Sequence, residues 1–287
     1  MKKNFVITFF LIPILAYCQK YFLLDSLKEN FLVKEYTLKT KELYKVDREV
    51  KVYNVFLSKN NILLLSVLPN LDSQDSWTAI NTQDFVDKVL SKNEILNLAT
   101  DWIDDNNPDK KTLNYNLIKK ENDKYYISNT CLIEIFCLRD YKYPFSSHYG
   151  VINLNEKKVS IKEMQKAFLQ QFPSEDFIMD VRNNNRIKNV DHQYLFKNYI
   201  SKKYKIKNQY AYQFWTFDGW WITDGYNYQR GIDRFVYIPS MGIVGGSYDF
   251  YFELKPKISS NNYYTISRKD LWDNIINEKV MIAEELK

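Results

Sequence analysis

The chain has 287 residues, of which 45% are hydrophobic and 26% are charged, a composition typical of globular proteins with a substantial core. Its formal charge of +5, to which Lys2 and Lys3 contribute two, is too small to predict binding to nucleic acid or to an anionic bilayer. The sequence carries no cofactor motif and no metal-ligand spacing, so we expect neither a cofactor nor a metal.

The N-terminal segment has the pattern of a signal peptide. Lys2 and Lys3 form a positive region, residues 5–16 form an apolar region, and small residues precede a cleavage point after Cys18. We therefore expect residues 1–18 to be removed and the protein to act in the periplasm or as a secreted protein. No later apolar run approaches the ~20 residues that a membrane-spanning helix needs.

The alternative at this end is a lipoprotein. Residues 15–18 read Leu-Ala-Tyr-Cys, which is close to the box in which a cysteine is acylated and becomes the first mature residue. The bulky Tyr17 stands where that box needs a small residue, so cleavage after Cys18 is favoured. Lipidation at Cys18, with a membrane-anchored protein, stays open.

The first half of the chain predicts mostly strands. Sequence patterns predict strands over 35–44, 49–57, 62–68, 112–119, 124–128, 131–138 and 149–154. Between them, Ser91 and Glu94 form a capping box at the start of a helix. In the strand over 131–138, Cys131 and Cys137 are six residues apart, about 20 Å along a strand, so they cannot form a disulfide with each other and are expected as buried thiols.

The second half predicts helices around another set of strands. Ser160 and Glu163 form a second capping box, Asp191 is expected to cap a helix, and Ser267 is expected to begin a last helix. The helix after Asp191 would turn its apolar residues inward: Leu195, Phe196, Tyr199 and Ile200. Strands are expected over 210–254, with one set of residues facing in (Val244, Gly246, Tyr248, Phe250, Phe252) and the other facing out (Ser247, Asp249, Tyr251, Glu253).

Runs of like elements predict an α+β fold with antiparallel sheets, helices packed on one side and a C-terminal helix. We expect an N-terminal α+β region over 19–158 and a C-terminal α+β region over 159–287. One continuous domain fits the sequence nearly as well as two regions.

An aromatic segment supplies the candidate binding site. Asp218-Gly219 predicts a tight hairpin turn that would place Trp215 opposite Ile222. Both faces of this hairpin are aromatic, which predicts either a hairpin buried between two layers or a surface on which sugar or peptide groups stack. The candidate ligand-binding residues are Tyr212, Trp215, Asp218, Trp220, Trp221, Asp224 and Arg230.

The sequence contains no set of residues with the spacing of a known catalytic or metal site. Asp249 and Glu253 on one strand face would lie about 13 Å apart, too far for a glycosidase pair. His148 and His192 fit no zinc or triad pattern, and the run 105–109 lacks the glycine and the glutamate that a calcium loop needs. A basic group, Lys202, Lys203, Lys205 and Lys207, could bind anionic glycans, but a solvated helix end is the default expectation.

These observations predict an exported, non-catalytic binding or envelope-interaction protein. Its expected partners are a glycan, a peptide or an envelope protein. The alternative is an exported hydrolase that acts on a glycan or peptide polymer, with the aromatic hairpin as its substrate platform.

Overall fold

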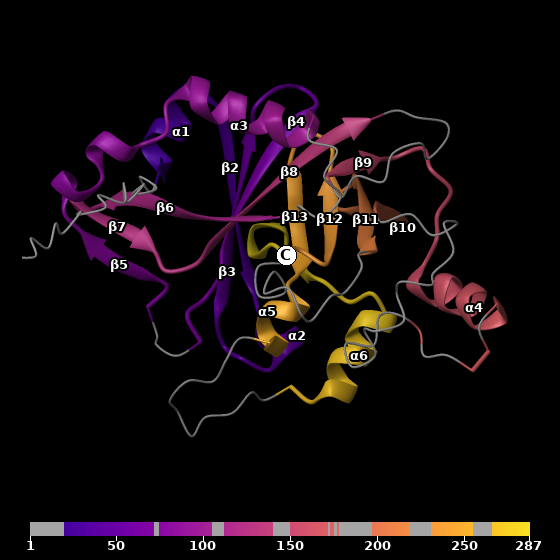
Figure 1. Cartoon of the computed structure of the whole chain (residues 1–287). Helices are drawn as coiled ribbons and strands as arrows, with labels where there is room; N and C mark the ends of the chain where they lie inside the picture. The colour runs from indigo at the N-terminus through magenta and orange to yellow at the C-terminus, as the bar shows by residue number, and fades with distance from the viewer. Residues whose placement is uncertain are drawn as a thin grey trace, which may run out of the picture.

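The chain folds as two stacked β-sheets with helices around them. The computed structural model describes residues 20–71, 75–104, 112–139, 150–171, 173–174, 177, 197–217, 231–254 and 266–287. Figure 1 shows the two sheets face to face, with α1 and α3 beside one of them and α2, α5 and α6 near one end. The α+β class with two largely antiparallel sheets is therefore confirmed.

Within the described residues, the large sheet has nine strands in the order β2-β3-β4-β8-β6-β7-β5, with β1 beside β6 and β9 beside β8. The pairs β1–β6 and β8–β9 are parallel and the other neighbours are antiparallel. Its strands are β1 (Tyr21–Leu23), β2 (Leu32–Lys39), β3 (Glu49–Phe56), β4 (Asn61–Val67), β5 (Trp77–Ile80), β6 (Leu113–Glu121), β7 (Lys124–Ser128), β8 (Cys131–Arg139) and β9 (Val151–Asn153).

The small sheet is antiparallel throughout and, counted over the described part of the chain, has five strands in sequence order. They are β10 (Lys197–Ile206), β11 (Gln209–Phe217), β12 (Arg234–Ile238), β13 (Gly242–Ser247) and β14 (Met281–Ile282). The helices are α1 (Leu24–Asn30), α2 (Lys41–Tyr44), α3 (Lys92–Asp104), α4 (Ile161–Gln171), α5 (Asp249–Leu254) and α6 (Arg268–Ile276), with short 3-10 turns η1 (Thr82–Asp84), η2 (Val86–Lys88) and η5 (Glu284–Leu286).

The main core lies between the two sheets. Strand alternation turns Val50 and Val52 of β3 into this core, where they belong to one cluster with Phe214 of β11 and Phe235 of β12. Phe235 stacks on Phe214 and meets Phe136 of β8 edge-on, with centroids 5.1 Å apart in both pairs. This one cluster contains side chains from before and after residue 158, the predicted boundary between the N-terminal and C-terminal regions.

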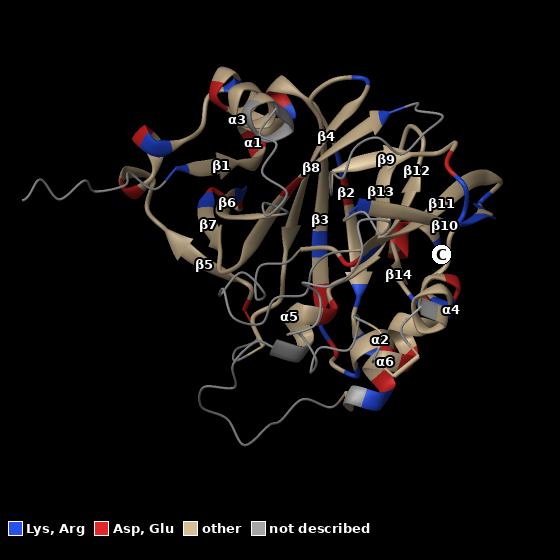
Figure 2. Cartoon of the chain, turned by 45° about the vertical axis from the view of Figure 1, so that its right-hand side comes forward, with Lys and Arg blue, Asp and Glu red and all other residues tan. Residues whose placement is uncertain are grey.

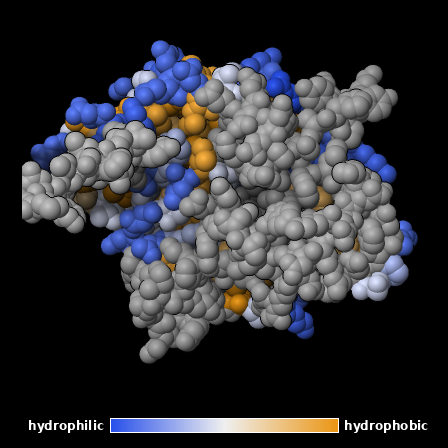
Figure 3. Space-filling view, viewed as in Figure 1, coloured by the Kyte–Doolittle hydropathy of each residue, from blue (hydrophilic) through white to orange (hydrophobic). Residues whose placement is uncertain are grey.

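The other face of the large sheet has its own apolar layer. Val55 and Ile133 point to this side and pack with Leu27 of α1 and Ile95 of α3. Because both faces are covered, β4 can be an almost unbroken apolar run. In Figure 3, apolar residues show between hydrophilic ones at the upper left of the view, where α1 and α3 lie.

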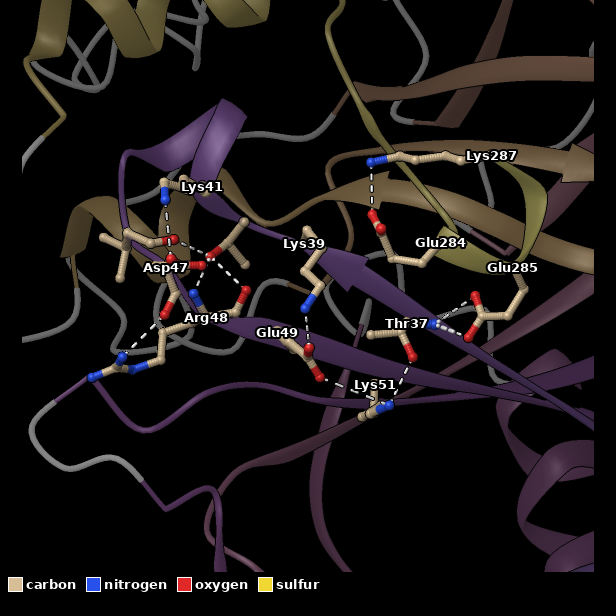
Figure 4. A network of polar contacts seen from close by, with 12 residues as sticks. Thr37, Lys39, Lys41, Asp47, Arg48, Glu49, Lys51, Glu284, Glu285 and Lys287 are labelled. Carbon is tan, nitrogen blue, oxygen red and sulfur yellow. Dashed lines mark hydrogen bonds and ion pairs between the residues drawn. The ribbon is translucent and has the colours of Figure 1, made fainter.

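The C-terminal segment joins the edge of the large sheet to the small sheet. Ala283, just after β14, is fully buried and donates its N–H to Val244 O at 2.9 Å. The N–H of Thr37 on β2 donates to both carboxylate oxygens of Glu285 at 3.1 and 3.2 Å, as Figure 4 shows. Glu285 thus satisfies the outward N–H of Thr37 at the edge of β2.

Several predicted local signals are confirmed. Ser91 and Glu94 exchange hydrogen bonds at the start of α3, and Ser160 and Glu163 do the same at α4. Ser267 Oγ accepts from Asp270 N at 3.1 Å, so α6 begins where the sequence predicted, although the chain continues past it to β14 and η5. Cys131 and Cys137 are buried thiols on β8.

Three predicted elements are wrong in whole or in part. The last residues of the strand expected over 35–44 form the short helix α2, in which the adjacent Leu43 and Tyr44 are both buried. Residues 197–200, expected in a helix, begin strand β10, where Tyr199 lies opposite Trp215 and Ile200 opposite Phe214. Their apolar spacing fitted a helix because this end of the small sheet is buried on both faces.

The last part of the predicted strand region is the short helix α5. The strand β13 ends at Ser247, and Asp249, expected to face out, is fully buried at the start of that helix. Asp249 and Glu253 therefore lie one helical turn apart, and the strand distance that excluded them as a pair does not apply.

The helices are distributed rather than gathered on one side. Helices α1 and α3 contribute to the outer layer of the large sheet, whereas α2, α4, α5 and α6 contribute to the core between the sheets. Over the described residues, the chain forms no helix of the length and apolarity that spanning a membrane requires.

Candidate functional site

The predicted ligand-binding residues fall largely outside the described part of the chain. Tyr212 and Trp215 lie on β11 and are described. The remaining candidates, Asp218, Trp220, Trp221, Asp224 and Arg230, and also Cys18, His148, His192 and residues 105–109, lie outside the described residues.

Trp215 is a core residue. Its side chain is fully buried, its Nε1–H donates to Val159 O at 2.8 Å, and its ring stacks on Tyr199 with centroids 5.1 Å apart. Its neighbours in the sheet are Tyr199 and Arg234, not Ile222, because β11 is paired on both sides by β10 and β12. The predicted pairing of Trp215 is therefore wrong, although the Asp218-Gly219 turn itself lies outside the described residues, and the buried Trp215 ring offers no surface for a ligand.

A buried charged cluster lies beside Trp215. Arg234 forms two hydrogen bonds with the carboxylate of Asp249, one of them from Nη2 to Oδ1 at 3.1 Å. Tyr44 Oη–H donates to Asp249 Oδ1 at 2.9 Å, and Asp249 N donates to Asp233 Oδ2 at 2.7 Å. All four residues are buried, so this cluster ties β12 to α5 and α2 inside the protein.

Burial sets the protonation of this cluster. Desolvation raises the pKa of the Asp249 carboxyl, and Arg234 and Tyr44 oppose the rise because they stabilise the charged form. Desolvation, followed by the charge of Asp249, holds the pKa of Tyr44 well above its ordinary range, so the phenol remains a hydrogen-bond donor. Arg234 also donates Nε–H to Lys279 O at 3.0 Å. Its guanidinium therefore connects β12 to helix α5 and to the main chain at Lys279, which is a structural role.

Other polar side chains connect the two sheets across the core. Asn54 of β3 bonds both the N–H and the C=O of Ile243, at 2.7 and 2.9 Å. Ser66 Oγ lies 2.7 Å from Tyr248 Oη, and Glu134 Oε2 accepts from Ile232 N at 2.9 Å. Each of these bonds satisfies a buried polar group and fixes how one sheet lies on the other.

The exposed part of the β10–β11 hairpin has a different character. Lys203 lies opposite Tyr212, and Lys205 lies opposite Tyr210, all on one face. Lys203 Nζ is 4.3 Å from the ring centroid of Tyr210 and 5.2 Å from that of Tyr212, and Lys205 Nζ is 5.4 Å from that of Tyr210. We name these four residues the lysine–tyrosine face; Figure 2 shows the basic positions along β10 at the right-hand side of the molecule.

The lysine–tyrosine face is accessible and positively charged. Tyr210 is 53% exposed, Lys203 and Lys205 are exposed, and Tyr212 is half-buried. Among the residues that the structure describes, no carboxylate lies within ion-pair distance of Lys203 or Lys205. Their ammonium groups are held by cation–π contacts alone, which leaves their charge available to an anion.

Some other lysines that lie over rings pair with a carboxylate, whereas Lys34 and Lys92, which lie over Phe56 and Phe31, have no described ion pair. Lys119 lies 4.8 Å from the ring centroid of Trp77 but pairs with Glu121 at 2.7 Å. Lys197 lies 4.8 Å from the centroid of Tyr199 and pairs with Glu156 at 2.8 Å. Lys202, on the opposite face of β10, pairs with Glu278 at 3.2 Å. The lysine–tyrosine face thus differs from the Lys119, Lys197 and Lys202 sites in lacking a described counter-ion.

The sequence identified part of this surface. Tyr212 belonged to the predicted ligand-binding residues, and Lys203 and Lys205 belonged to the predicted basic group, which was expected at a helix end. The structure places them on a strand, where alternation brings Lys203 and Lys205 to one face and Lys202 to the other. In the described part of the chain, no group of three or more His, Cys, Asp and Glu residues is arranged to hold a metal ion.

Comparisons with family models, with curated proteins and with solved structures find no match for this chain.

Proposed function

We propose that this chain is an exported, non-catalytic binding protein, and that the lysine–tyrosine face is its binding surface for an anionic partner. The observation that carries the proposal is the exposed Tyr210 ring flanked by two ammonium groups that have no described counter-ion. A fixed aromatic ring and preorganised cations form a recognition surface at little cost in side-chain entropy.

Export is supported by the N-terminal sequence. Lys2, Lys3 and the apolar residues 5–16 have the order of a signal peptide, with cleavage proposed after Cys18. Mass spectrometry of the protein purified from its native host tests this step. We expect an unmodified chain that begins at Gln19; a diacylated Cys18 would instead show a membrane-anchored lipoprotein.

Binding to a polyanion tests the surface itself. Polyglutamate, labelled for fluorescence anisotropy, is the probe, and the double variant Lys203→Ala/Lys205→Ala is compared with the wild type at low and physiological salt. Each exposed charge contact contributes roughly 0.5–1 kcal/mol, so loss of both lysines should weaken binding about tenfold.

Lys119→Ala is the matched control, because Lys119 also lies over aromatic rings but already has Glu121 as its partner. We expect this variant to bind polyglutamate as the wild type does. Equal binding by the wild type and by Lys203→Ala/Lys205→Ala, or no binding by either, would contradict the proposal.

The hydrolase alternative depends on residues 218–230, His148 and His192, which lie outside the described residues. The same polyglutamate assay bears on it, because a hydrolase acting on this polymer would shorten it during incubation. We expect its length to be unchanged.

A further inference from the structure

Strand β10 forms one edge of the small sheet, and the residues that the structure describes cover only part of this edge. Beside the first half of the strand, Val159 N donates to Ile200 O at 2.8 Å, and Asn198 Nδ2 donates to Val151 O at 3.2 Å. The chain's own segment therefore already adds to β10 from outside. Beyond Ile200, no described segment continues this addition.

The second half of β10 presents its main chain outward at two lysines. A two-residue turn, Lys207-Asn208 with φ values of 45° and 67°, joins β10 to β11 and makes Ile206 and Gln209 the first paired residues. Main-chain groups alternate in direction along a strand, so the N–H and C=O of Tyr204 face β11, while those of Lys203 and Lys205 face away from it. Over the described residues, no main-chain group bonds to these outward groups.

We propose that an extended acidic peptide adds to β10 as an extra strand along Lys203–Lys205. This inference rests on the proposed function and names the partner of the same surface. Residues two apart on the added strand are about 7 Å apart and share one face, the same spacing as the two lysines. Acidic side chains at alternate positions therefore meet the ammonium groups while the main chains form ladder hydrogen bonds.

The geometry favours a peptide over a polysaccharide. Lys203 Nζ sits 4.3 Å from the centre of the Tyr210 ring, so the ring face on which a sugar would stack is partly occupied by an ammonium group. A polysaccharide also leaves the outward N–H and C=O groups without the regular partners that a strand supplies. The two lysines add selectivity, because a neutral or basic strand would bury their charges without compensation.

The experiment uses the full mature chain and a short peptide that alternates glutamate with threonine. Its controls are the same peptide N-methylated along one edge and a peptide that alternates lysine with threonine. We expect the acidic peptide to bind, and both control peptides to bind at least tenfold more weakly. Tight binding of the N-methylated peptide would overturn strand addition.

Variants at Lys205 separate the main chain from the side chain. Lys205→Ala removes the ammonium group. Lys205→Pro also removes the outward N–H, and proline is accommodated in an edge strand where the missing N–H would face away from the sheet. We expect Lys205→Pro to bind the acidic peptide about fivefold or more weakly than Lys205→Ala, with both variants retaining the wild-type circular dichroism spectrum. Equal affinities of the two folded variants would contradict strand addition.

If Lys205→Pro does not fold, the affinity of the N-methylated peptide relative to the unmodified acidic peptide is the test of strand addition. A polyuronate that competes with polyglutamate, together with no binding of the acidic peptide, would overturn the peptide inference and leave the proposed binding function intact. Failure of the wild type to bind polyglutamate, the polyuronate and the peptide would overturn both.

Discussion

Replacing Asp249 by Asn tests whether the buried charged cluster holds the two halves of the core together. The substitution keeps the size of the side chain but removes the charge that faces Arg234 and replaces one acceptor by an NH₂ group. Since the Asp249 and Arg234 side chains are only 2% and 1% exposed, water cannot compensate the guanidinium. The variant therefore leaves a buried cation without its carboxylate.

The expected loss follows from that burial. Removing one partner of a buried ion pair costs about 3–5 kcal/mol, whereas an exposed pair contributes about 0–1 kcal/mol. Glu49→Gln supplies the control, because Glu49 and Lys39 form a hydrogen-bonded pair whose side chains are 41% and 44% exposed (Figure 4).

Urea unfolding followed by far-ultraviolet circular dichroism measures both variants. With a slope of about 3 kcal/mol per M, the midpoint should fall by about 1–1.7 M for Asp249→Asn and by less than about 0.3 M for Glu49→Gln. A loss below about 1 kcal/mol for Asp249→Asn would refute the reasoning, because it would mean that Arg234 is not held as a buried cation by this carboxylate.

Two further predictions concern the capping box and the core tryptophan. The main-chain hydrogen bond from Ser91, followed by the hydrogen bond from Lys20, lowers the pKa of Glu94 from 4.5 to about 2, so its stabilising charge is fully present above pH 4.5 and is lost as the pH falls through 2. Glu94→Gln should therefore be less stable than the wild type at pH 7 and equal to it below about pH 2 in urea unfolding; a difference that stays constant with pH would contradict this. Trp215→Ala should cost about 3–5 kcal/mol of stability because the ring is buried, with peptide affinity unchanged for the folded fraction; a stable variant that lost only binding would show instead that Trp215 contacts the ligand.

The sequence predicted correctly those elements that are determined by interactions between residues close in sequence. The predicted strand over 124–128 coincides with β7, because a period of two with one covered face has a single solution. The capping boxes at Ser91 and Ser160 were recognisable because both partners lie within four residues.

The errors arose where burial on both faces removed the periodic signal. Tyr199 and Ile200 are adjacent and both buried, which reads equally as a helix stripe or as a strand between two layers. Strand alternation predicted that Asp249 would face solvent. Its partners Arg234 and Tyr44 lie at other positions in the sequence, and no local pattern indicates their contacts with Asp249.

The candidate site was predicted in its residue types but not in its arrangement. Lys203 and Lys205 alternate with the partly buried Tyr204 and Ile206, a period of two that indicates a strand and could have placed the lysines on one face. What brings Tyr210 between them is the Lys207-Asn208 turn, and its register is fixed by pairing of β11 with β10. This turn was missed because Lys207 and Asn208 both have positive φ without the glycine that marks the usual two-residue hairpin turn.

The central claim is that a partner adds to the open edge of β10, and amide hydrogen exchange at single-residue resolution tests it most directly. With the peptide that alternates glutamate with threonine, the account predicts that the amides of Lys203 and Lys205 become protected, while that of Tyr204, already facing β11, changes little. Unchanged exchange at Lys203 and Lys205 under saturating peptide would contradict the account.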